Sequence, residues 1–349
     1  MKSQRTLYPM KAVVLTKTGE PEVLLVTNIN EPAPGPGEVR VRIHYAGINY
    51  AEILSRKGLY GWAPKRPYIL GMEASGLIDE LGEGVDAALL GQSVMVGAKT
   101  GAYAEKIVIP TNQAIPSPES FSMEESAAFL VNYLTAWVSL FTMAKTQPGD
   151  KVLITAAAGG VGTAAVQLCS ALGCRVYGMA GSEGKMDFIK SLGAKDAFNY
   201  SSPDCFEDLL SQTNGVDVAL ETVGGDVFKR SLNSLNPFGR IVVAGFASLN
   251  LKKWNPYSWY KTWRDIPGAD IRVMSQKSVS VMSCHLGYLM EEEPEKMESI
   301  YVELKDFVLR HGIKPVIGKV FILGEAPRAH RHIESRKSVG KVLLRLTDS

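Results

Sequence analysis

A glycine-rich segment near the middle of the chain limits the folds open to this sequence more than any other feature. Residues 155–162 read Thr-Ala-Ala-Ala-Gly-Gly-Val-Gly and lie between an apolar run, 151–155, and a helical stretch, 160–172. Glycines in such a turn let backbone amides approach a pyrophosphate closely, and the helix N-terminus adds unpaired N–H groups and a positive dipole end. The segment therefore predicts a phosphate-binding loop, although Ala157 replaces the first glycine of the dinucleotide-binding motif. The alternative is a tight strand–helix turn without a ligand.

Apolar runs and helical stretches alternate on both sides of this loop. Such alternation predicts an α/β fold with a parallel sheet covered by helices on both faces. The expected strands are 151–155, 175–178, 216–220 and 240–244, and the expected helices are 160–172, 183–192, 204–213 and 226–235. A strand-like run at 278–283, a helix at 294–311 and a final strand at 341–345 follow.

The first 110 residues have a different pattern and predict a β-rich domain. Residues 38–44 alternate charged or polar with apolar side chains, as in a half-buried strand, and further short strands are expected at 11–17, 76–81 and 92–96. From Ser122, a helix N-cap with acidic residues in its first turn predicts a helix over 124–144 that breaks near Asn132. A length of 349 residues, 46% of them hydrophobic, suits two domains.

The end of the second strand of the α/β part indicates which nucleotide is bound. NAD enzymes place an acidic residue there to bind the ribose 2′-hydroxyl. Residues 176–182 contain no acid, Ala180 occupies the expected position, and Lys185 follows. A missing carboxylate beside a cation favours a 2′-phosphate, so the sequence predicts NADPH rather than NADH. The alternative for Lys185 is a solvated helix face.

Several motifs together resemble the medium-chain dehydrogenase/reductases of the quinone oxidoreductase (zeta-crystallin-like) type. They are Gly47-Ile48-Asn49, Gly58-Leu59-Tyr60, Gly71-Met72-Glu73-Ala74-Ser75-Gly76, the glycine-rich loop, Asn199-Tyr200 and Val339-Gly340-Lys341-Val342. Residues 130–136 and 285–289 and Ile313-Lys314-Pro315 also resemble VAT-1-like proteins. The resemblance implies a GroES-like catalytic domain (1–131 and 287–349), a Rossmann NADPH-binding domain (132–286) and a cofactor in the cleft between them.

The same resemblance implies a site without a metal. Zinc alcohol dehydrogenases of the superfamily carry a cysteine ligand and a Gly-His-Glu segment where this chain has Asn49 and Gly71-Met72-Glu73. An amide and a thioether are poor replacements for the thiolate and imidazole that zinc prefers. The four-cysteine loop of a structural zinc site is missing as well. We therefore expect no metal, and a structural role for Glu73, paired inside its domain.

The resemblance places two candidate catalytic residues, Asn49 and Tyr60, at the cleft. Asn49 can orient the nicotinamide or donate a hydrogen bond to a substrate oxygen, and Tyr60 can donate to a carbonyl or developing enolate. The alternatives are a turn-forming asparagine and a core or lid aromatic.

The remaining candidates surround the cofactor. The glycine-rich loop places Gly159, Gly160 and Val161 at the diphosphate. The resemblance implies Thr135 near the diphosphate or the nicotinamide ribose, Gly181, Lys185 and Tyr200 around the 2′-phosphate, Phe246 near the nicotinamide, and Arg336 reaching in from the C-terminal segment. For Arg336 a surface position is an equal alternative. Among the histidines, His285 could line the cleft, whereas His311, His330 and His332 are expected at the surface.

Two classes of function remain open. The first is an NADPH-dependent reductase of a quinone or of an enone or enal. The second is a VAT-1-like adaptor or lipid-interacting protein with low turnover, suggested by tryptophans, tyrosines and basic residues interleaved over 251–264. That segment is equally open to being a substrate lid or a dimer contact.

Composition narrows the partners and the compartment. A net charge of +2 argues against a nucleic-acid surface. Four cysteines without metal or disulfide spacing, no apolar stretch behind Lys2 and Arg5, and no 18-residue apolar run favour a cytoplasmic protein. The resemblance implies a homodimer that pairs through the edge strand near 278–283.

Overall fold

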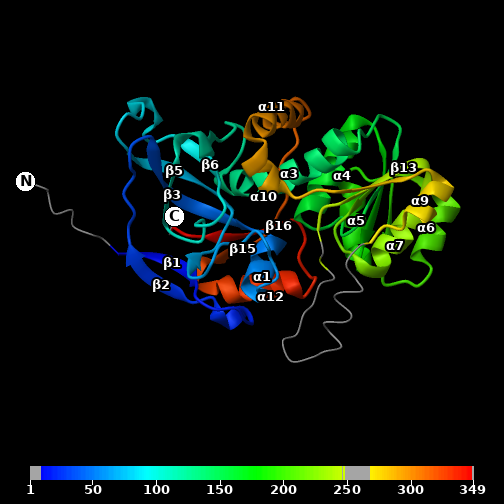
Figure 1. Cartoon of the computed structure of the whole chain (residues 1–349), viewed down its shortest axis with the longest axis horizontal. Coiled ribbons are helices and arrows are strands. Elements are labelled where there is room, and N and C mark those ends of the chain that lie inside the picture. Colours follow the sequence, from blue (N-terminus) through cyan, green and yellow to red (C-terminus); the bar gives the residue numbers. More distant parts are fainter. Residues whose placement is uncertain (1–8, 246, 248–267, 348–349) are drawn as a thin grey trace, which may run out of the picture. The chain divides into compact units, whose positions relative to one another are not determined.

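The computed structural model describes residues 9–245, 247 and 268–347, which divide into two units (Figure 1). The first unit contains Met1–Val131 and Lys314–Ser349, and the second contains Asn132–Ile313. From the sequence, we expected the chain to re-enter the first domain at residue 287. In the structure, α10 (Leu286–Glu292) and α11 (Pro294–Arg310) belong to the second unit, where Phe307 packs against Trp137 with ring centroids 5.2 Å apart.

The first unit is built on a mixed sheet that joins both ends of the chain. In spatial order its strands are β15 (Ile317–Ile322), β16 (Lys341–Arg345), β3 (Glu38–Ile48), β5 (Glu73–Leu81), β6 (Ser93–Gly97) and β8 (Ala114–Pro116), with β7 (Lys106–Pro110) paired to β3. A second sheet contains β2 (Val26–Asn30), β1 (Pro9–Leu15) and β4 (Tyr68–Ile69). β16, red in Figure 1, pairs antiparallel with the blue β3, so that Leu343 lies opposite Gly47.

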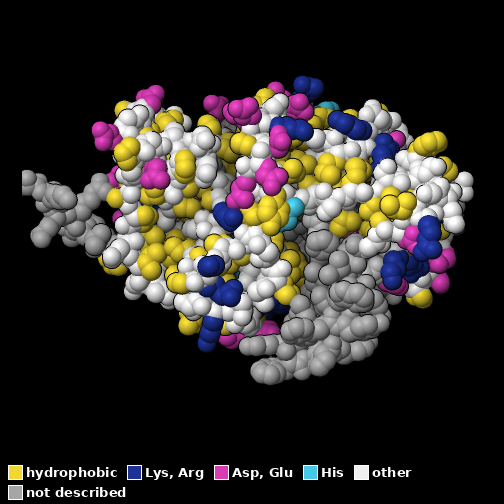
Figure 2. All heavy atoms as spheres, viewed as in Figure 1, with side chains coloured by type: hydrophobic (Ala, Val, Ile, Leu, Met, Phe, Trp, Pro, Cys, Tyr) yellow, Lys and Arg dark blue, Asp and Glu magenta, His cyan; other side chains and the backbone are white. Residues whose placement is uncertain are grey.

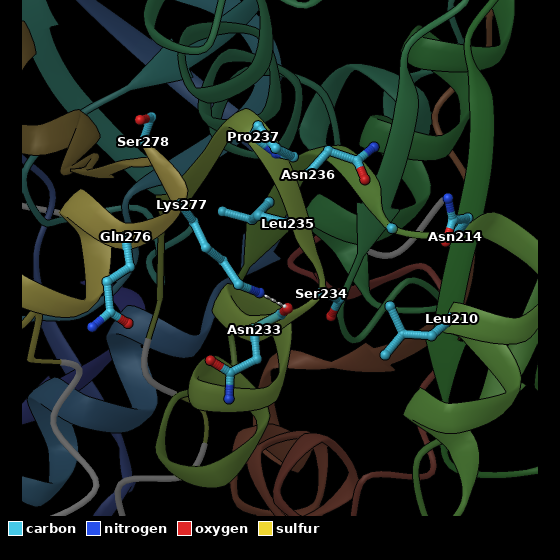
Figure 3. A pocket seen from close by; sticks show the side chains of 11 residues that line it. Leu210, Asn214, Asn233, Ser234, Leu235, Asn236, Pro237, Gln276, Lys277 and Ser278 are labelled. Atoms are coloured by element: carbon cyan, nitrogen blue, oxygen red, sulfur yellow. Dashed lines mark hydrogen bonds between the residues drawn. The ribbon is translucent and has the colours of Figure 1, made fainter.

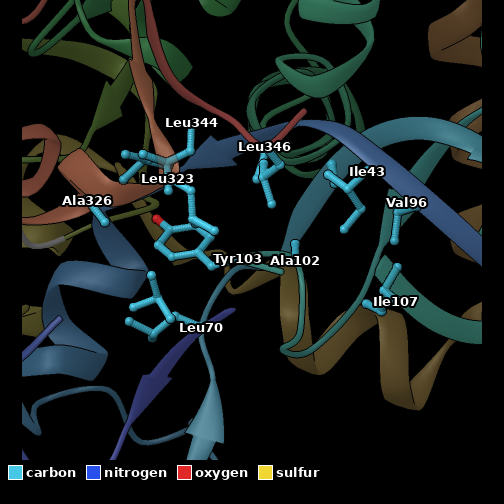
Figure 4. Close-up of a cluster of buried hydrophobic side chains, with 14 of the residues drawn as sticks. Ile43, Leu70, Val96, Ala102, Tyr103, Ile107, Leu323, Ala326, Leu344 and Leu346 are labelled. Carbon is cyan, nitrogen blue, oxygen red and sulfur yellow. The ribbon is translucent and has the colours of Figure 1, made fainter. Parts of the chain in front are cut away.

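The core of this unit follows from the alternation in β3. Val39, Val41 and Ile43 are fully buried, and Arg40 and Arg42 alternate with them. Figure 4 shows Ile43 in the same cluster as Tyr103, which lies beside Leu70, Leu323 and Leu344. Burial of each large apolar side chain contributes about 1.5–3 kcal/mol to the stability of the fold. The alternation predicted for this strand therefore identifies the side chains that stabilise the core.

One predicted surface residue lies in this core. His330, in α12 (Ala326–Glu334), is fully buried, and its Nε2 lies 3.4 Å from the Tyr103 hydroxyl. The expectation of a surface histidine was wrong because Ala326, Ala329 and His330 share the helix face turned to the core. Burial, helped by the positive charge of Arg56, lowers the pKa of His330 to about 3.

The second unit contains the predicted parallel sheet. Its strands in spatial order are β11 (Asp196–Asn199), β10 (Arg175–Ala180), β9 (Lys151–Ile154), β12 (Val216–Glu221), β13 (Leu235–Val243) and β14 (Ser280–Ser283), and all their pairings are parallel. The helices that connect them include α4 (Gly160–Leu172), α5 (Glu183–Ser191), α6 (Cys205–Thr213), α7 (Gly225–Asn233) and α9 (Ile271–Lys277). The α/β prediction is confirmed. β11 was not predicted from the sequence, since it has only two apolar residues, Ala197 and Phe198.

The predicted helix over 124–144 is three shorter elements. α2 (Met123–Ala127) begins at the expected N-cap, Ser122, whose hydroxyl accepts the N–H of Glu125. α3 (Leu130–Trp137) and a π-helix (Val138–Met143) follow. The break lies at residues 128–129 and not near Asn132, because the N–H of Val131 turns to the Glu73 carboxylate.

Among the described residues, no helix is both long and apolar enough to cross a membrane.

Acidification should destabilise the protein through His330. His330 takes up a proton near its ordinary pKa of 6.5 in the unfolded chain and near a pKa of 3 in the folded chain. The contribution of neutral His330 to the free energy of unfolding is therefore fully present above pH 6.5 and is lost as the pH falls toward 3. The slope approaches about 1.4 kcal/mol per pH unit in that range. Urea unfolding between pH 7.5 and 4.5 should therefore show a shallower loss in His330→Leu than in the wild type. Parallel curves for the two proteins would contradict this expectation.

Candidate active site

Asn49 occupies the junction between β3 and α1 (Tyr50–Lys57). Asparagine is a preferred helix N-cap, and Glu52, three residues later, returns its carboxylate to the Asn49 backbone N–H at 2.8 Å. The local sequence therefore fixes the backbone of Asn49 at the end of a buried strand. Its side chain is 8% exposed.

A lysine from the other end of the chain holds the Asn49 side chain. Lys341 opens β16, and its Nζ donates to Asn49 Oδ1 at 2.6 Å and to the Glu73 carboxylate. The side chains of Lys341 and Glu73 are 2% and 1% exposed. The other Glu73 oxygen accepts the N–H of Val131 at 3.0 Å. Glu73 is thus paired inside its domain, as the sequence predicted.

The amide nitrogen of Asn49 is left without a partner in the described part of the chain. An ammonium group can only donate, so the contact with Lys341 assigns the carboxamide oxygen to that side. Nδ2 then points elsewhere and is buried without a hydrogen-bond acceptor. A buried donor left unpaired costs about 1–3 kcal/mol. An acceptor on a ligand would remove that cost.

A second buried carboxyl group, that of Glu52, affects the electrostatics around Asn49. Glu52 is fully buried, and it also accepts the N–H of Met72 at 3.0 Å. Burial raises the pKa of Glu52 to about 7, although the nearby Lys341 charge acts in the opposite direction. The cluster around Asn49 therefore changes its net charge near neutral pH.

Tyr60 lies just beyond the left-handed Gly58 that ends α1, and it is half-buried. Its ring meets Trp62 edge-on, with centroids 6.3 Å apart, and the Lys99 ammonium lies 4.6 Å from the Trp62 ring centre. The catalytic role of Tyr60 stays a prediction.

Arg336 follows α12 in the left-handed region, at φ 57°, and is exposed. Burial raises the pKa of Tyr50, the first residue of α1, and the positive charge of Arg336 acts in the opposite direction. Arg336 therefore lies near the start of α1 in the first unit, and its role toward a cofactor stays a prediction.

The phosphate loop of the second unit has close packing on the glycines that the sequence singled out. A Cβ on Gly160 would lie 2.6 Å from Asn132 Nδ2, and one on Gly162 would lie 2.4 Å from the Ala156 carbonyl oxygen. Gly159 is the N-cap of α4, and Val161 lies half-buried in its first turn. The predicted order of strand, loop and helix is present.

Thr135 lies on α3, on the side that meets this loop. It follows Asn132 by three residues, so both side chains occupy one helix face. Because Asn132 touches Gly160, that face lies against the start of α4. Thr135 is 8% exposed.

Two of the predicted 2′-phosphate residues meet at the ends of β10 and β11. Gly181 follows β10 and Tyr200 follows β11, and a Cβ on Gly181 would lie 3.0 Å from the Tyr200 hydroxyl oxygen. Lys185 is half-buried in the first turn of α5, and burial lowers its pKa. The end of β10 carries Ala180 and no acidic side chain, as the sequence showed.

Other expectations stay predictions or fall outside the described residues. His285 is the N-cap of α10, and its Nδ1 accepts the Tyr288 N–H at 3.3 Å, which gives it a structural role. Phe246 and the segment 251–264 lie outside the described residues. Within the described ranges, no three His, Cys, Asp or Glu side chains lie close enough to hold a metal ion.

Three residues that hold candidate residues in place, two in the first unit and one in the second, were not predicted from the sequence. Lys341 appeared there only as part of a motif, and Glu52 was not considered, although Asn-x-x-Glu is a helix-capping pattern. Glu221, buried at the end of β12, accepts the N–H groups of Val223 and Gly224 at 2.8 and 2.9 Å. It also lies 3.3 Å from the hydroxyl of Thr155, which opens the phosphate loop.

A shallow pocket of about 530 Å³ lies elsewhere on the second unit (Figure 3). Its lining includes Asn214, Leu235 and Ser278, which precede or begin β12, β13 and β14. It therefore lies at the amino ends of the strands, whereas the phosphate loop follows a carboxyl end.

On the face shown in Figure 2, basic and acidic side chains are interspersed, with no continuous basic patch among the described atoms of that view.

Comparison with known proteins gives consistent matches. Residues 35–119 match the alcohol dehydrogenase GroES-like domain, and residues 160–301 match the zinc-binding dehydrogenase family. The chain is 35% identical to the human synaptic vesicle membrane protein VAT-1 homolog, over 90% of this chain and 80% of that protein. It is 35% identical to the Bos taurus quinone oxidoreductase-like protein 2, over 93% and 89%. The structure of Escherichia coli quinone oxidoreductase complexed with NADPH superposes with a TM-score of 0.84 at 30% identity, covering 96% of this chain and 99% of that one.

Replacing Gly162 by alanine should disrupt the phosphate loop. The new Cβ would meet the Ala156 carbonyl oxygen at 2.4 Å and the Ala157 backbone at 2.6 Å, and backbone cannot move aside cheaply. We expect a loss of about 1–3 kcal/mol in unfolding free energy, measured by urea denaturation. Gly184→Ala is the matched control, because a Cβ there meets nothing within 4 Å and the residue lies in α5. It should be neutral or stabilising by up to about 1 kcal/mol, and an equal loss in both variants would contradict the packing argument.

Proposed function

Since the chain belongs to the medium-chain dehydrogenase/reductase family, among the VAT-1 homologues and quinone oxidoreductases, we propose that it is an NADPH-dependent reductase of conjugated carbonyl compounds. The family makes the chain an oxidoreductase. The proposal adds the cofactor, the substrate class, which is a quinone or an α,β-unsaturated carbonyl, and a reaction that uses no metal ion.

The observation that carries the substrate class is the buried, unpaired Nδ2 of Asn49. A carbonyl oxygen is the acceptor that such a donor lacks, and negative charge grows on that oxygen during hydride transfer. A preorganised donor in a water-poor site stabilises this charge more than it stabilises the ground state. Quinones and enones are already activated by conjugation, so one or two hydrogen bonds to the oxygen can support hydride transfer to them without a metal ion. Tyr60 would be the second donor.

The second unit supplies a fitting cradle for NADPH. Gly159, Gly160 and Val161 would present backbone amides of the α4 N-terminus to the diphosphate, with Thr135 beside them. Gly181, Tyr200 and Lys185 would hold the 2′-phosphate, because the bare Gly181 surface lies under the Tyr200 ring and no carboxylate at the end of β10 repels an anion. The bound cofactor supplies the hydride. The E. coli relative, whose structure was determined with NADPH, supports this choice.

The proposed assembly is a homodimer in the cytoplasm with a small-molecule substrate. β14 is the last strand of the described sheet on its side and pairs with β13, so its outer edge could take a second copy of the chain. All four cysteines are free, which suits a reducing compartment. Phe246 and Arg336 would complete the cofactor contacts.

The competing proposal is a membrane-associated adaptor with low turnover. It is motivated by the name of the 35% identical human relative, a synaptic vesicle membrane protein, and by the aromatic and basic residues of 251–264. Sedimentation with anionic vesicles at low salt separates the two proposals. Failure of the protein to pellet would end the adaptor alternative.

The reductase proposal predicts NADPH oxidation with a quinone panel or an enone panel, followed at the nicotinamide absorbance band. Turnover should be the same with and without a metal chelator, because Asn49 and Met72 occupy the positions of zinc ligands in zinc-dependent family members. The panel with the higher kcat/KM identifies the substrate class. Tight NADPH binding without turnover on either panel would overturn the reductase proposal, and a chelator-sensitive rate would overturn its metal-free part.

Lys185→Ala should weaken NADPH binding by about 10–100-fold, the value of one charge-assisted hydrogen bond, and leave NADH binding nearly unchanged. Only NADPH carries the extra phosphate. Lys190→Ala is the matched control, since Lys190 lies on the same helix and pairs with Asp196 at 3.0 Å. Fluorescence titration gives both dissociation constants. Equal weakening of NADH and NADPH by Lys185→Ala would show that this lysine does not select the phosphate.

A further inference from the structure

We propose that Lys341 is a positioning residue for the reduction: it holds the carboxamide of Asn49 so that the amide nitrogen faces the substrate, and it strengthens that nitrogen as a donor. The inference rests on the proposed function, because it names the group behind the proposed substrate donor. It assigns this task to a residue 292 positions away in the sequence.

The pairing of the two strands places the lysine. β16 runs antiparallel to β3 with Val342 opposite Ile48, so Lys341 lies beside the end of β3, where Asn49 begins the turn into α1. The aliphatic part of the lysine passes close to Gly47, since a Cβ there would lie 2.7 Å from Lys341 Cε. Glycine at 47 thus leaves room for the lysine to reach Asn49.

The chemistry of the ammonium determines the direction of the amide. A neutral hydroxyl or amide neighbour could accept as well as donate and would allow Asn49 to turn over. Lys341 offers donors alone, so Oδ1 of Asn49 must face it, at 2.6 Å, and Nδ2 must face away. The lysine therefore determines that Nδ2, which has no acceptor among the described residues, is the amide atom that faces away from it.

The ion pair with Glu73 does not by itself explain the lysine. Two buried charges usually contribute little net stability, because desolvation offsets their attraction, and an apolar pair of the same size often does as well. An apolar pair would lose two contacts, that of Glu73 with the Val131 N–H and that of Lys341 with Asn49, and only the second belongs to the lysine. This is the reason to assign the lysine a task beyond stability.

The same charge also acts on the reaction. A cation on the oxygen of an amide polarises it and makes its N–H a stronger donor. In the proposed step the acceptor carbon would gain the hydride as a new C–H bond while the C–H bond at the dihydronicotinamide breaks. The π bond of the acceptor would break, and its electron pair would move to the carbonyl oxygen. The acceptor is reduced by two electrons, NADPH is oxidised to NADP⁺, and the oxygen later takes a proton from water. Nδ2 would stabilise the oxygen while it carries the charge.

The test compares the double variant Lys341→Met/Glu73→Gln with Glu73→Gln. Removing the lysine alone would leave buried carboxylates without their cation, whereas the pair of changes removes one charge of each sign. We expect kcat of the double variant to fall about 10–100-fold below that of Glu73→Gln, the range seen when a supporting group behind a functional ligand is removed. The NADPH dissociation constant should differ little between the two, and the double variant should melt at the same or a higher temperature than Glu73→Gln, which keeps a buried lysine without its carboxylate.

A double-mutant cycle separates positioning from general structural damage. In the Asn49→Ala background the removal of Lys341 should leave kcat unchanged, because the amide that it positions is gone. If the double variant does not fold, Lys341→Arg takes its place, with a smaller kcat loss that again vanishes in the Asn49→Ala background. An equal kcat loss in both backgrounds, or none in either, would overturn the proposal.

A measurement without turnover keeps this inference separate from the proposed function. The side-chain amide signals of Asn49 in ¹⁵N-labelled protein can be assigned by their absence in Asn49→Ala. They should shift when Lys341 is replaced and should stay close to the wild-type position in Glu73→Gln. Unchanged signals would refute the contact even in an active enzyme, whereas an inactive wild type with the expected shifts would refute only the proposed function.

Discussion

The contact between Lys341 and its two partners, Glu73 and Asn49, joins the two distant parts of the chain that make up the first unit. A buried lysine needs a compensating charge, and a buried carboxylate needs donors. Lys341 on β16 and Glu73 on β5 therefore compensate each other only when both strands are in place. The whole second unit is inserted between them in the sequence, so the last strand must return before the site around Asn49 is complete. The GroES-like fold thus makes the site depend on the C-terminal segment.

The second unit rests on a different constraint, the meeting of strands at one edge of a parallel sheet. Thr155 and Glu221 follow or end adjacent strands, β9 and β12, and their side chains lie 3.3 Å apart. Glu221 in turn ties down the turn at Val223 and Gly224. A carboxylate at the end of one strand therefore organises two loops at the edge where ligands bind in such sheets.

The elements that the sequence predicted well are those whose pattern is local. Strand and helix periodicity, the glycine-rich loop and the cap at Ser122 all act over a few residues, and the structure contains each of them. Asn49 was predicted through resemblance to a family, because nothing in its neighbours shows that its amide lacks a partner. That property exists only once β16 is in place.

Lys341, His330 and β11 were missed for different reasons. In residues 341–345, Lys-Val-Leu-Leu-Arg reads as an apolar strand between two solvated charges, and the burial of Lys341 makes sense only with Glu73, 268 positions away. His330 looked like a surface residue between Ala329 and Arg331, and its helix face could be recognised only if alanines are counted as core residues. β11 was missed because two apolar residues in a row are too few to show a period.

The chemistry proposed for this chain follows from what occupies the positions of zinc ligands in the zinc-dependent family members. A metal ion polarises a carbonyl directly and can activate even a simple ketone. Asn49 offers a single amide donor, and the charge behind it, on Lys341, acts through that amide rather than on the substrate. Such a donor stabilises charge that has already begun to delocalise, so it is matched to acceptors whose conjugation lowers the barrier to hydride attack. The proposed reaction therefore pairs a positioned amide, in place of a metal ion, with quinones and enones as substrates.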